Sequence, residues 1–416
     1  MHSADPETRP PLPEAPPAGT GSFEVRPETP AFEAREVHDL YWVLAGSQGL
    51  RAGWSLAIFA VLYRLFSGVV GLVVSGLVPT ISEFEFSPRF ALIGEMIPLL
   101  ALVGALAVLA QVEHRKILNY NLAGPRPAAS FFEGAAAGFA ALSVLVGVLA
   151  LGGWLHFGAV GLSGKRIMLY AAAWGAVFLL VGLFEEGTFR YYLQFTLTRG
   201  VNFWWALAIV AALCLDLLLR AMGNPAGILG ALWLRVMPGS GGNGVYGVYA
   251  VALLGLVPCL MLYLKEAQGA GFWQAAWVTS TFFGYIHTSN SGENWIGIFS
   301  AAFIGFVFCV SVRVTGSAWW AIGCHTAWDW AETYFYGTAD SGIQARGHFL
   351  STSPAGNTLW SGGADGPEGS LLVLAAIMLL LAALLAIHGR RRSGARSIRS
   401  FIADGWESTN PHRPRS

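Results

Sequence analysis

The chain has 416 residues, of which 54% are apolar and 12% are charged, and its mean hydropathy is +0.53. This composition excludes a soluble globular protein, and a net charge of zero without a basic stripe excludes a nucleic-acid partner. We therefore predict an all-α fold, a polytopic transmembrane helical bundle that has the lipid bilayer as its surroundings.

The two ends of the chain differ in composition from its centre. Residues 1–35 hold many prolines and no apolar stretch, so they cannot bury enough surface to offset the entropy of ordering. We predict a disordered cytoplasmic tail with a juxtamembrane segment over 1–50, a transmembrane domain over 51–390 and a basic cytoplasmic tail over 391–416.

The apolar runs of the central region are long enough to cross a hydrocarbon core of about 30 Å. In chain order they cover residues 53–79, 90–112, 133–154, 168–198, 203–220, 245–265, 271–290, 295–314, 317–336 and 371–388. The expected number of spans is therefore roughly ten.

The basic residues predict how these spans are oriented. Lys and Arg near span ends favour the cytoplasmic side, and the densest cluster is Arg390–Arg399, after the last span. An even number of spans then places both termini in the cytoplasm. The same rule leaves the acidic 338–369 loop on the outer side.

A first polar cluster, Glu185-Glu186-x-x-x-Arg190, interrupts the fourth run. Glu186 and Arg190 are four residues apart, so they share one helical face and can form an ion pair. Glu185 is left as the unpaired carboxylate, which can act as a general base towards water. A structural ion pair at a helix end is an equally open interpretation of this cluster alone.

Two later runs carry histidines. Phe283 precedes His287 by four residues, so its ring can pack beside the imidazole and hold its orientation. His325 precedes Asp329 by four residues, and a carboxylate behind an imidazole fixes its tautomer. A lone membrane histidine is usually a hydrogen-bonded core residue, but two of them with a nearby acidic pair favour a functional site.

These polar clusters are expected to meet. A charge that faces lipid at mid-bilayer costs about 3 kcal/mol, so four such residues facing outward would together cost on the order of 10 kcal/mol. Turning inward towards one another, they would form one buried hydrolytic site. The sequence has no His-Glu-x-x-His zinc motif, Gly-x-Ser-x-Gly elbow or Walker loop, which excludes those familiar sites.

The order of the three motifs resembles the CPBP family, the intramembrane proteases related to CAAX prenyl endopeptidases and to bacteriocin-processing or abortive-infection proteins. The similarity covers about 168–336, and the stretch from Thr315 to Trp319 also looks like that family. The resemblance implies an endopeptidase in a bacterial plasma membrane that hydrolyses a peptide bond of a membrane-embedded or lipidated protein. Residues 51–390 would be its protease domain.

The resemblance also implies which residues carry the reaction. The implied catalytic residues are Glu185, Glu186, His287, His325 and Asp329. Glu185 and His287 would activate the water, and His325 with residue 329 would stabilise the oxyanion. Arg190 and Phe283 would support them structurally, with Arg190 holding Glu186.

Asp329 departs from the family pattern, in which this position is typically Asn. An ionised Asp accepts hydrogen bonds but does not donate them, so it cannot itself stabilise an oxyanion. It would instead hold His325 as the donor.

A second departure is the distance from Arg190 to Phe283, nearly a hundred residues, where the family usually needs only a short loop. Two apolar runs within 203–265 fill it, which predicts an inserted pair of spans added to a family core of about eight. Asp216 and Arg220 in the first of these runs are four residues apart and are expected to neutralise each other.

The sequence leaves the metal open. Glu185, His287 and His325 could hold Zn²⁺ as two imidazoles and a carboxylate with an open water position, and many related proteins are called metalloproteases by motif alone. A Glu–His pair in a dry cavity can also activate water without a metal. We prefer the metal-independent mechanism and keep zinc as the alternative.

Two other functions compete with proteolysis. A proton-coupled transporter also carries buried Glu, His and Asp, but it is expected to contain internal repeats, and none relates the two halves of this chain. A catalytically idle immunity or binding protein is the other alternative. The intact motif residues favour the enzyme over it.

Overall fold

A computed structural model describes residues 43–46, 49–77, 87–222, 244–290 and 292–389. The chain divides into a short unit, 1–45, and a large unit, 46–416, which contains the helices from α2 (Ala52–Leu77) to α14 (Leu372–Leu384). The predicted cytoplasmic tails, apart from a few residues before residue 51, and the Arg390–Arg399 cluster lie outside the described residues.

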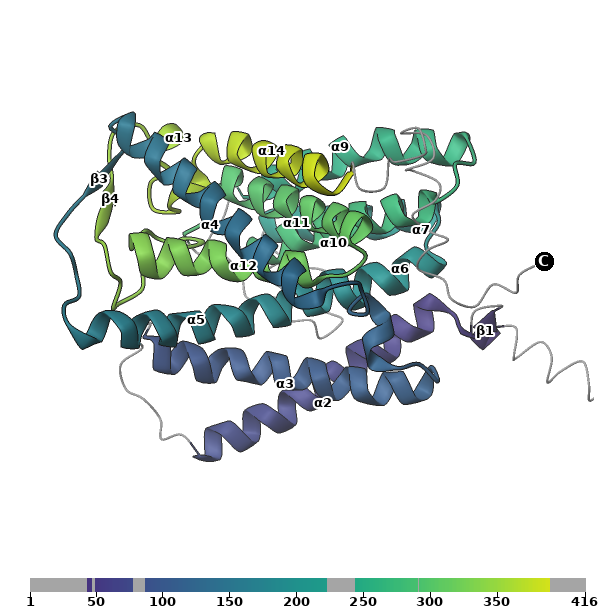
Figure 1. Cartoon of the computed structure of the whole chain (residues 1–416). Coiled ribbons are helices and arrows are strands. Elements are labelled where there is room, and N and C mark those ends of the chain that lie inside the picture. Colours follow the sequence, from purple (N-terminus) through teal and green to yellow (C-terminus); the bar gives the residue numbers. More distant parts are fainter. Residues whose placement is uncertain (1–42, 47–48, 78–86, 223–243, 291, 390–416) are drawn as a thin grey trace, which may run out of the picture. The chain divides into compact units, whose positions relative to one another are not determined.

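Helices make up nearly all of the described structure (Figure 1). The first half contains β1 (Ala45–Gly46), β2 (Gly49–Leu50), α2 (Ala52–Leu77), α3 (Pro88–Val112), η1 (Ile117–Tyr120), α4 (Pro127–Leu151), β3 (Leu155–Phe157), α5 (Lys165–Glu186), η2 (Gly187–Leu193), α6 (Gln194–Gly200) and α7 (Phe203–Ala221). The second half contains α9 (Val245–Leu264), α10 (Ala270–His287), α11 (Trp295–Thr315), α12 (Trp319–Asp329), η3 (Trp330–Tyr336), β4 (Thr352–Pro354), α13 (Thr358–Ser361), η4 (Pro367–Gly369), α14 (Leu372–Leu384) and η5 (Leu385–Gly389). The predicted all-α helical bundle is confirmed.

Each of the ten predicted spans corresponds to a helical segment, and several predicted spans extend a few residues past the helix ends. Among the described residues, eight candidate spans are long and apolar enough to cross a membrane, and one of them, Lys165–Gly200, joins α5, η2 and α6. The other two predicted spans are α10 and α12 with η3. Helix α10 carries the buried polar residues Gln274, Thr279 and Ser280, and α12 is 11 residues long before it widens into η3.

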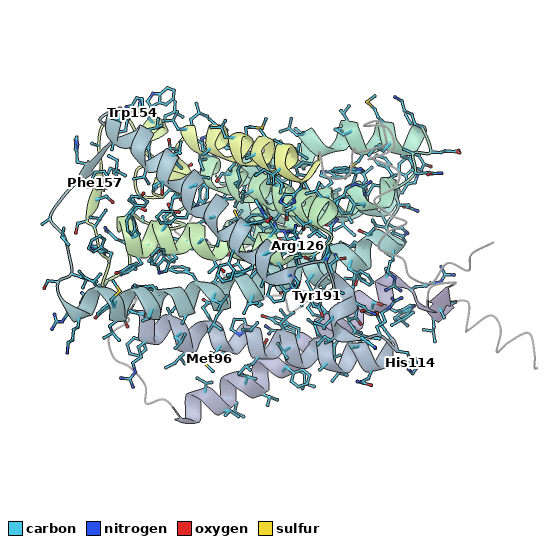
Figure 2. All side chains as sticks on the ribbon, in the orientation of Figure 1. Met96, His114, Arg126, Trp154, Phe157 and Tyr191 are labelled. Atoms are coloured by element: carbon cyan, nitrogen blue, oxygen red, sulfur yellow. The ribbon has the colours of Figure 1, made fainter. Side chains whose placement is uncertain are left out.

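Large apolar side chains cover the outside of the bundle, as expected for surfaces in contact with lipid. Val61, Leu72 and Leu151 are 69%, 74% and 91% exposed. Met96 also faces outward from α3, whereas Tyr191 in η2 is only 2% exposed (Figure 2). With eight candidate spans in its described part, the chain is an integral membrane protein.

Helices α12 and α4 contact each other along much of their length, and glycines allow this close approach. Gly134 and Gly138 form a Gly-x-x-x-Gly pair on α4, the pattern that lets membrane helices approach closely. A Cβ atom at Gly134 would lie 2.0 Å from the Trp320 carbonyl oxygen, and one at Gly138 would lie 2.3 Å from that of Cys324. This close packing fixes the helix that carries His325.

Helices α10 and α11 form the other side of the core and pack against each other and against α9. Asn294 caps α11 by accepting hydrogen bonds from the Ile296 and Gly297 amides, at 2.7 and 3.3 Å. Gly316 ends α11 in the left-handed conformation, with φ of +85°. Strands β3 and β4 pair antiparallel, with Leu155 opposite Pro354.

Candidate active site

The first polar cluster, Glu185, Glu186 and Arg190, lies where the α-helix α5 changes into a π-helix. Helix α5 ends at Glu186 and continues without a break into η2, a wider π-helical segment that contains Arg190. Such segments inside helices occur frequently at functional sites. Helix α12 does the same after Asp329, where the π-helical η3 begins.

Glu186 and Arg190 form the predicted ion pair. Arg190 Nη1 donates to Glu186 Oε1 at 3.0 Å, and both side chains are fully buried. Arg190 Nε and Nη2 have no hydrogen-bond partner, but aromatic rings surround the guanidinium. Its Cζ atom lies 4.3 Å from the ring centroid of Phe283 and 5.4 Å from that of Phe308, so cation–π contacts take the place of further hydrogen bonds.

Gly305 on α11 leaves the space that the guanidinium needs. A Cβ atom at this position would lie 2.4 Å from Arg190 Nη2. On the other side, Asn121 Nδ2 donates to the Arg190 carbonyl oxygen at 2.9 Å. Three separate parts of the chain therefore hold the arginine in place.

His325 lies at the centre of the cluster, among three carboxylates. Its Nδ1 is 3.0 Å from Glu186 Oε1, and its Nε2 is 3.3 Å from Asp329 Oδ2 and 3.9 Å from Glu185 Oε2. The contact with Asp329 is the one predicted from spacing, and the contact with Glu186 extends it into a chain that runs from Arg190 to Asp329. With carboxylates at both nitrogens, the ring is oriented to donate from both when it is protonated.

Glu185 is more exposed than the neighbouring Glu186 and has fewer polar contacts. Its side chain is 23% exposed, its Oε2 has no hydrogen-bond partner, and the distance to His325 is too long for a hydrogen bond. Of the two adjacent glutamates, Glu185 is the one without an ion-pair partner at hydrogen-bond distance, as the spacing predicted.

His287 and Phe283 also lie as the spacing predicted. The two rings have their centroids 4.6 Å apart, and His287 Nδ1 donates to the Phe283 carbonyl oxygen at 2.8 Å. Because a carbonyl oxygen can only accept, Nδ1 carries a hydrogen and Nε2 of the neutral ring is left as an acceptor. The structure gives His287 no direct contact with Glu185 or His325 among the hydrogen bonds and ion pairs of the described residues.

One cavity of about 260 Å³ joins these side chains. The polar residues that line it include Glu95, Glu185, His287, Asn290, His325, Asp329 and Asp340. Asp340 follows η3, and burial raises the pKa of its carboxyl to about 6 even though Thr333 Oγ1 donates to it at 2.8 Å. Glu95, Asn290 and Asp340 were missed by sequence reasoning, because none of them belongs to a spaced motif.

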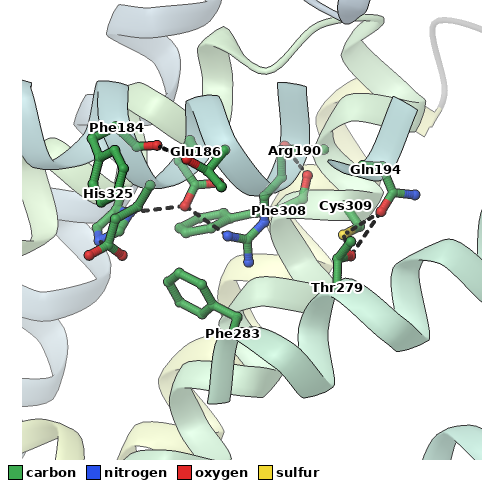
Figure 3. A network of polar contacts seen from close by, with 12 residues as sticks. Phe184, Glu186, Arg190, Gln194, Thr279, Phe283, Phe308, Cys309 and His325 are labelled. Atoms are coloured by element: carbon green, nitrogen blue, oxygen red, sulfur yellow. Dashed lines mark hydrogen bonds and ion pairs between the residues drawn. The ribbon is translucent and has the colours of Figure 1, made fainter. Parts of the chain in front are cut away.

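A second buried polar contact follows one turn after Arg190 (Figure 3). Gln194 Oε1 accepts hydrogen bonds from Thr279 Oγ1 at 3.0 Å and from Cys309 Sγ at 3.3 Å. Gln194 Nε2 donates to the Phe272 carbonyl oxygen at 3.2 Å. These contacts tie α6 to α10 and α11 and so fix the relative positions of the helices that carry the site.

The donor set does not suit a zinc ion held by Glu185, His287 and His325. These three side chains do not form a group with ligand atoms within 4.8 Å of one another in the described part of the chain. Both nitrogens of His325 already face carboxylate oxygens, at 3.0 and 3.3 Å. To bind this ring, a zinc ion would have to replace the contact of Nδ1 with Glu186 or that of Nε2 with Asp329.

The inserted helix α7 contacts α10, the helix that carries His287. Arg220 Nε donates to Asp216 Oδ2 at 2.7 Å, which is the predicted neutralisation. Tyr285, two residues before His287, also donates its hydroxyl hydrogen to Asp216 Oδ2. The described residues of the insertion therefore contact a helix of the site and do not line the cavity.

Comparison with known protein families supplies the assignment. Residues 258–331 match the family model of type II CAAX prenyl endopeptidase Rce1-like proteins. This segment belongs to the Rce1-like family. The predicted CPBP membership is thereby confirmed, and the Rce1-like segment contains His287, His325 and Asp329.

The Rce1-like segment begins at Pro258, in the second half of α9, so part of the second inserted span lies within it. Glu185, Glu186 and Arg190 lie before it, and their relation to the Rce1-like histidines comes from the three-dimensional contacts alone. At the level of the family, the activity is that of a CAAX-type endopeptidase acting on a protein substrate. No curated protein and no solved structure gives a significant match.

Proposed function

We propose that the protein is an intramembrane endopeptidase that hydrolyses a peptide bond of a membrane-associated or lipidated protein. The observation that carries this proposal is the arrangement of His325 between the Glu186–Arg190 ion pair and Asp329, on the wall of a cavity that Glu185 and His287 also line. A buried ion-pair network that only stabilised the fold would not need an unpaired carboxylate and a free imidazole nitrogen at the same cavity.

The proposed reaction uses Glu185 and His287, which line the cavity and each present an acceptor atom to it. Glu185 and Nε2 of His287 accept hydrogen bonds from a water molecule, and Glu185 takes its proton as the oxygen attacks the scissile carbonyl carbon. The C–N bond then breaks, and the leaving amine takes up the proton. The products are a new carboxylate and a new amine, so one water molecule is consumed for each bond broken.

The oxyanion formed during the attack needs a hydrogen-bond donor. His325 Nε2 faces the cavity between Asp329 and Glu185, and Glu186 holds the opposite nitrogen at 3.0 Å. We assign His325 as the donor and Asp329 and Glu186 as the carboxylates that orient it and balance its charge. Arg190 and Phe283 position Glu186 and the histidines.

The mechanism we propose does not use a metal ion, in line with the poor fit of the zinc ligand set. Treating the purified protein with a membrane-permeable zinc chelator, in a buffer that keeps other divalent ions, should leave cleavage unchanged. Loss of cleavage with stoichiometric release of zinc, and its return when zinc is added back, would refute this part of the proposal.

The substrate can be captured with a Glu185→Gln variant, which keeps the shape of the side chain and removes its ability to take a proton. Proteins that co-purify with the variant but not with the wild type are identified by mass spectrometry, and the wild type is tested for the corresponding new protein termini. We expect captured membrane-associated proteins that the wild type cleaves. Equal capture by both, with no new termini, would contradict proteolysis and favour the transporter or the idle binding protein.

A further inference from the structure

Three carboxylates from separate segments meet beside the cavity. Glu332 belongs to η3, Asp340 to the loop that follows it, and Glu368 to η4. One ligand oxygen from each lies within 4.8 Å of those of the other two. None of the three is needed by the proposed hydrolysis, although Asp340 and Glu368 border the same cavity.

The hydrogen-bond donors around this cluster are few. The Trp328 indole N–H is shared between Glu332 Oε2, at 3.1 Å, and Glu368 Oε1, at 2.9 Å. Ser341 Oγ donates to Glu368 Oε2 at 3.3 Å. In the described structure no Lys, Arg or His forms an ion pair with any member of the cluster.

Glu332 is the member that most needs a further partner. Its side chain is completely buried, and its Oε1 has no hydrogen-bond partner. A buried carboxylate oxygen without a donor is strongly unfavourable, and two further carboxylates at this distance add repulsion. A bound cation would satisfy the free oxygen and offset the charges of all three groups at once.

We propose that Glu332, Asp340 and Glu368 bind a hard divalent cation, and that this cation is Ca²⁺. All the ligands are oxygens, which excludes the soft metals that favour sulfur and nitrogen. Mg²⁺ usually keeps several of its waters and takes only one or two protein carboxylates, whereas Ca²⁺ accepts a set of carboxylates supplied by the protein. Three carboxylates from separate segments therefore favour Ca²⁺.

The ion has a structural role in this arrangement. It joins η3, which continues the helix of His325, to the 337–369 segment that borders the cavity. The bound ion thus cross-links these two segments and stabilises the part of the chain that borders the cavity. It is separate from the hydrolytic residues and independent of whether the protein cleaves peptides.

The test measures ion binding by the full-length protein in detergent. The purified protein is stripped with a chelator and titrated with Ca²⁺ and, separately, with Mg²⁺, while bound Ca²⁺ is counted by equilibrium dialysis and unfolding is followed by tryptophan fluorescence. We expect one Ca²⁺ per chain and a rise of about 5 °C in the apparent Tm at a Ca²⁺ concentration about 100 times the Kd.

Glu368→Gln removes one charge at a partly exposed position and should weaken Ca²⁺ binding at least about tenfold. Glu266→Gln, which removes an exposed carboxylate at the end of α9, is the control and should bind Ca²⁺ as the wild type does. Absence of bound Ca²⁺ and of any change in Tm in the wild type would overturn the proposal, even if the variants failed to fold. Tighter binding of Mg²⁺, or normal binding by Glu368→Gln, would also contradict it.

Discussion

Replacing Arg190 by methionine would test how the buried ion pair supports the site. In this variant Glu186 keeps His325 as a partner at 3.0 Å but loses the guanidinium at 3.0 Å. Because both members of the pair are fully buried, water cannot replace the lost contact. Breaking such a pair by removing one partner costs about 3–5 kcal/mol, which lowers the ratio of folded to unfolded protein by a factor of about 10²–10⁴.

The assay is thermal unfolding in detergent, followed by tryptophan fluorescence, together with protein abundance in the membrane. At about 2–4 °C per kcal/mol, Arg190→Met should lower the apparent Tm by about 10 °C. The matched control is Glu186→Gln combined with Arg190→Met, which leaves neither charge of the pair, keeps an acceptor for His325 Nδ1 and should recover most of the loss. A single variant that melts with the wild type, or a double variant that melts no higher than the single one, would refute this reasoning.

Three further predictions concern other parts of the protein. Replacing Asp216 and Arg220 together by alanine should cost less activity than replacing either one, because a single change removes only one of two opposite charges; equal losses at normal abundance would place this pair in the site. Burial raises the pKa of Asp365 to about 8, so the folded state keeps a proton that the unfolded state releases near pH 4. The free energy of unfolding should therefore fall as the pH rises from about 4 to about 8. The apparent Tm of the chelator-treated wild type should therefore be higher at pH 5 than at pH 8, and Asp365→Asn should reduce this difference; an unchanged difference would contradict the assignment. Reporter fusions after Ser400 and within 340–365 should report opposite sides of the membrane, and finding both on one side would overturn the predicted orientation.

Contacts between residues one helical turn apart could be predicted from the sequence. Glu186 with Arg190 and His325 with Asp329 follow from a spacing of four residues on helices whose apolar runs are unmistakable. The same runs gave the ten helical segments, including α10 and α12, because length and flanking residues identify a helix even when its inner face is polar.

The contact between His325 and Glu186 could not be predicted, since 139 residues separate them and only the packing of α12 against α4 and α5 brings them together. That packing depends on where individual glycines allow backbones to approach, as Gly138 does at Cys324. The cluster of Glu332, Asp340 and Glu368 could not be predicted either, because its members are far apart in the sequence and meet only through the packing of η3 and η4. The π-helical winding after Glu186 also has no recognisable sequence signal.

The central claim is that Glu185 and His287 activate the water that cleaves the peptide bond. It is tested most directly by the cleavage rate of purified protein in liposomes on a substrate obtained by capture. Glu185→Gln should lower that rate by at least about 100-fold while the apparent Tm stays near that of the wild type, and His287→Ala should also lower it strongly. The Glu266→Gln control should cleave normally. If Glu185→Gln cleaves at the wild-type rate, the assignment of Glu185 as the general base is wrong.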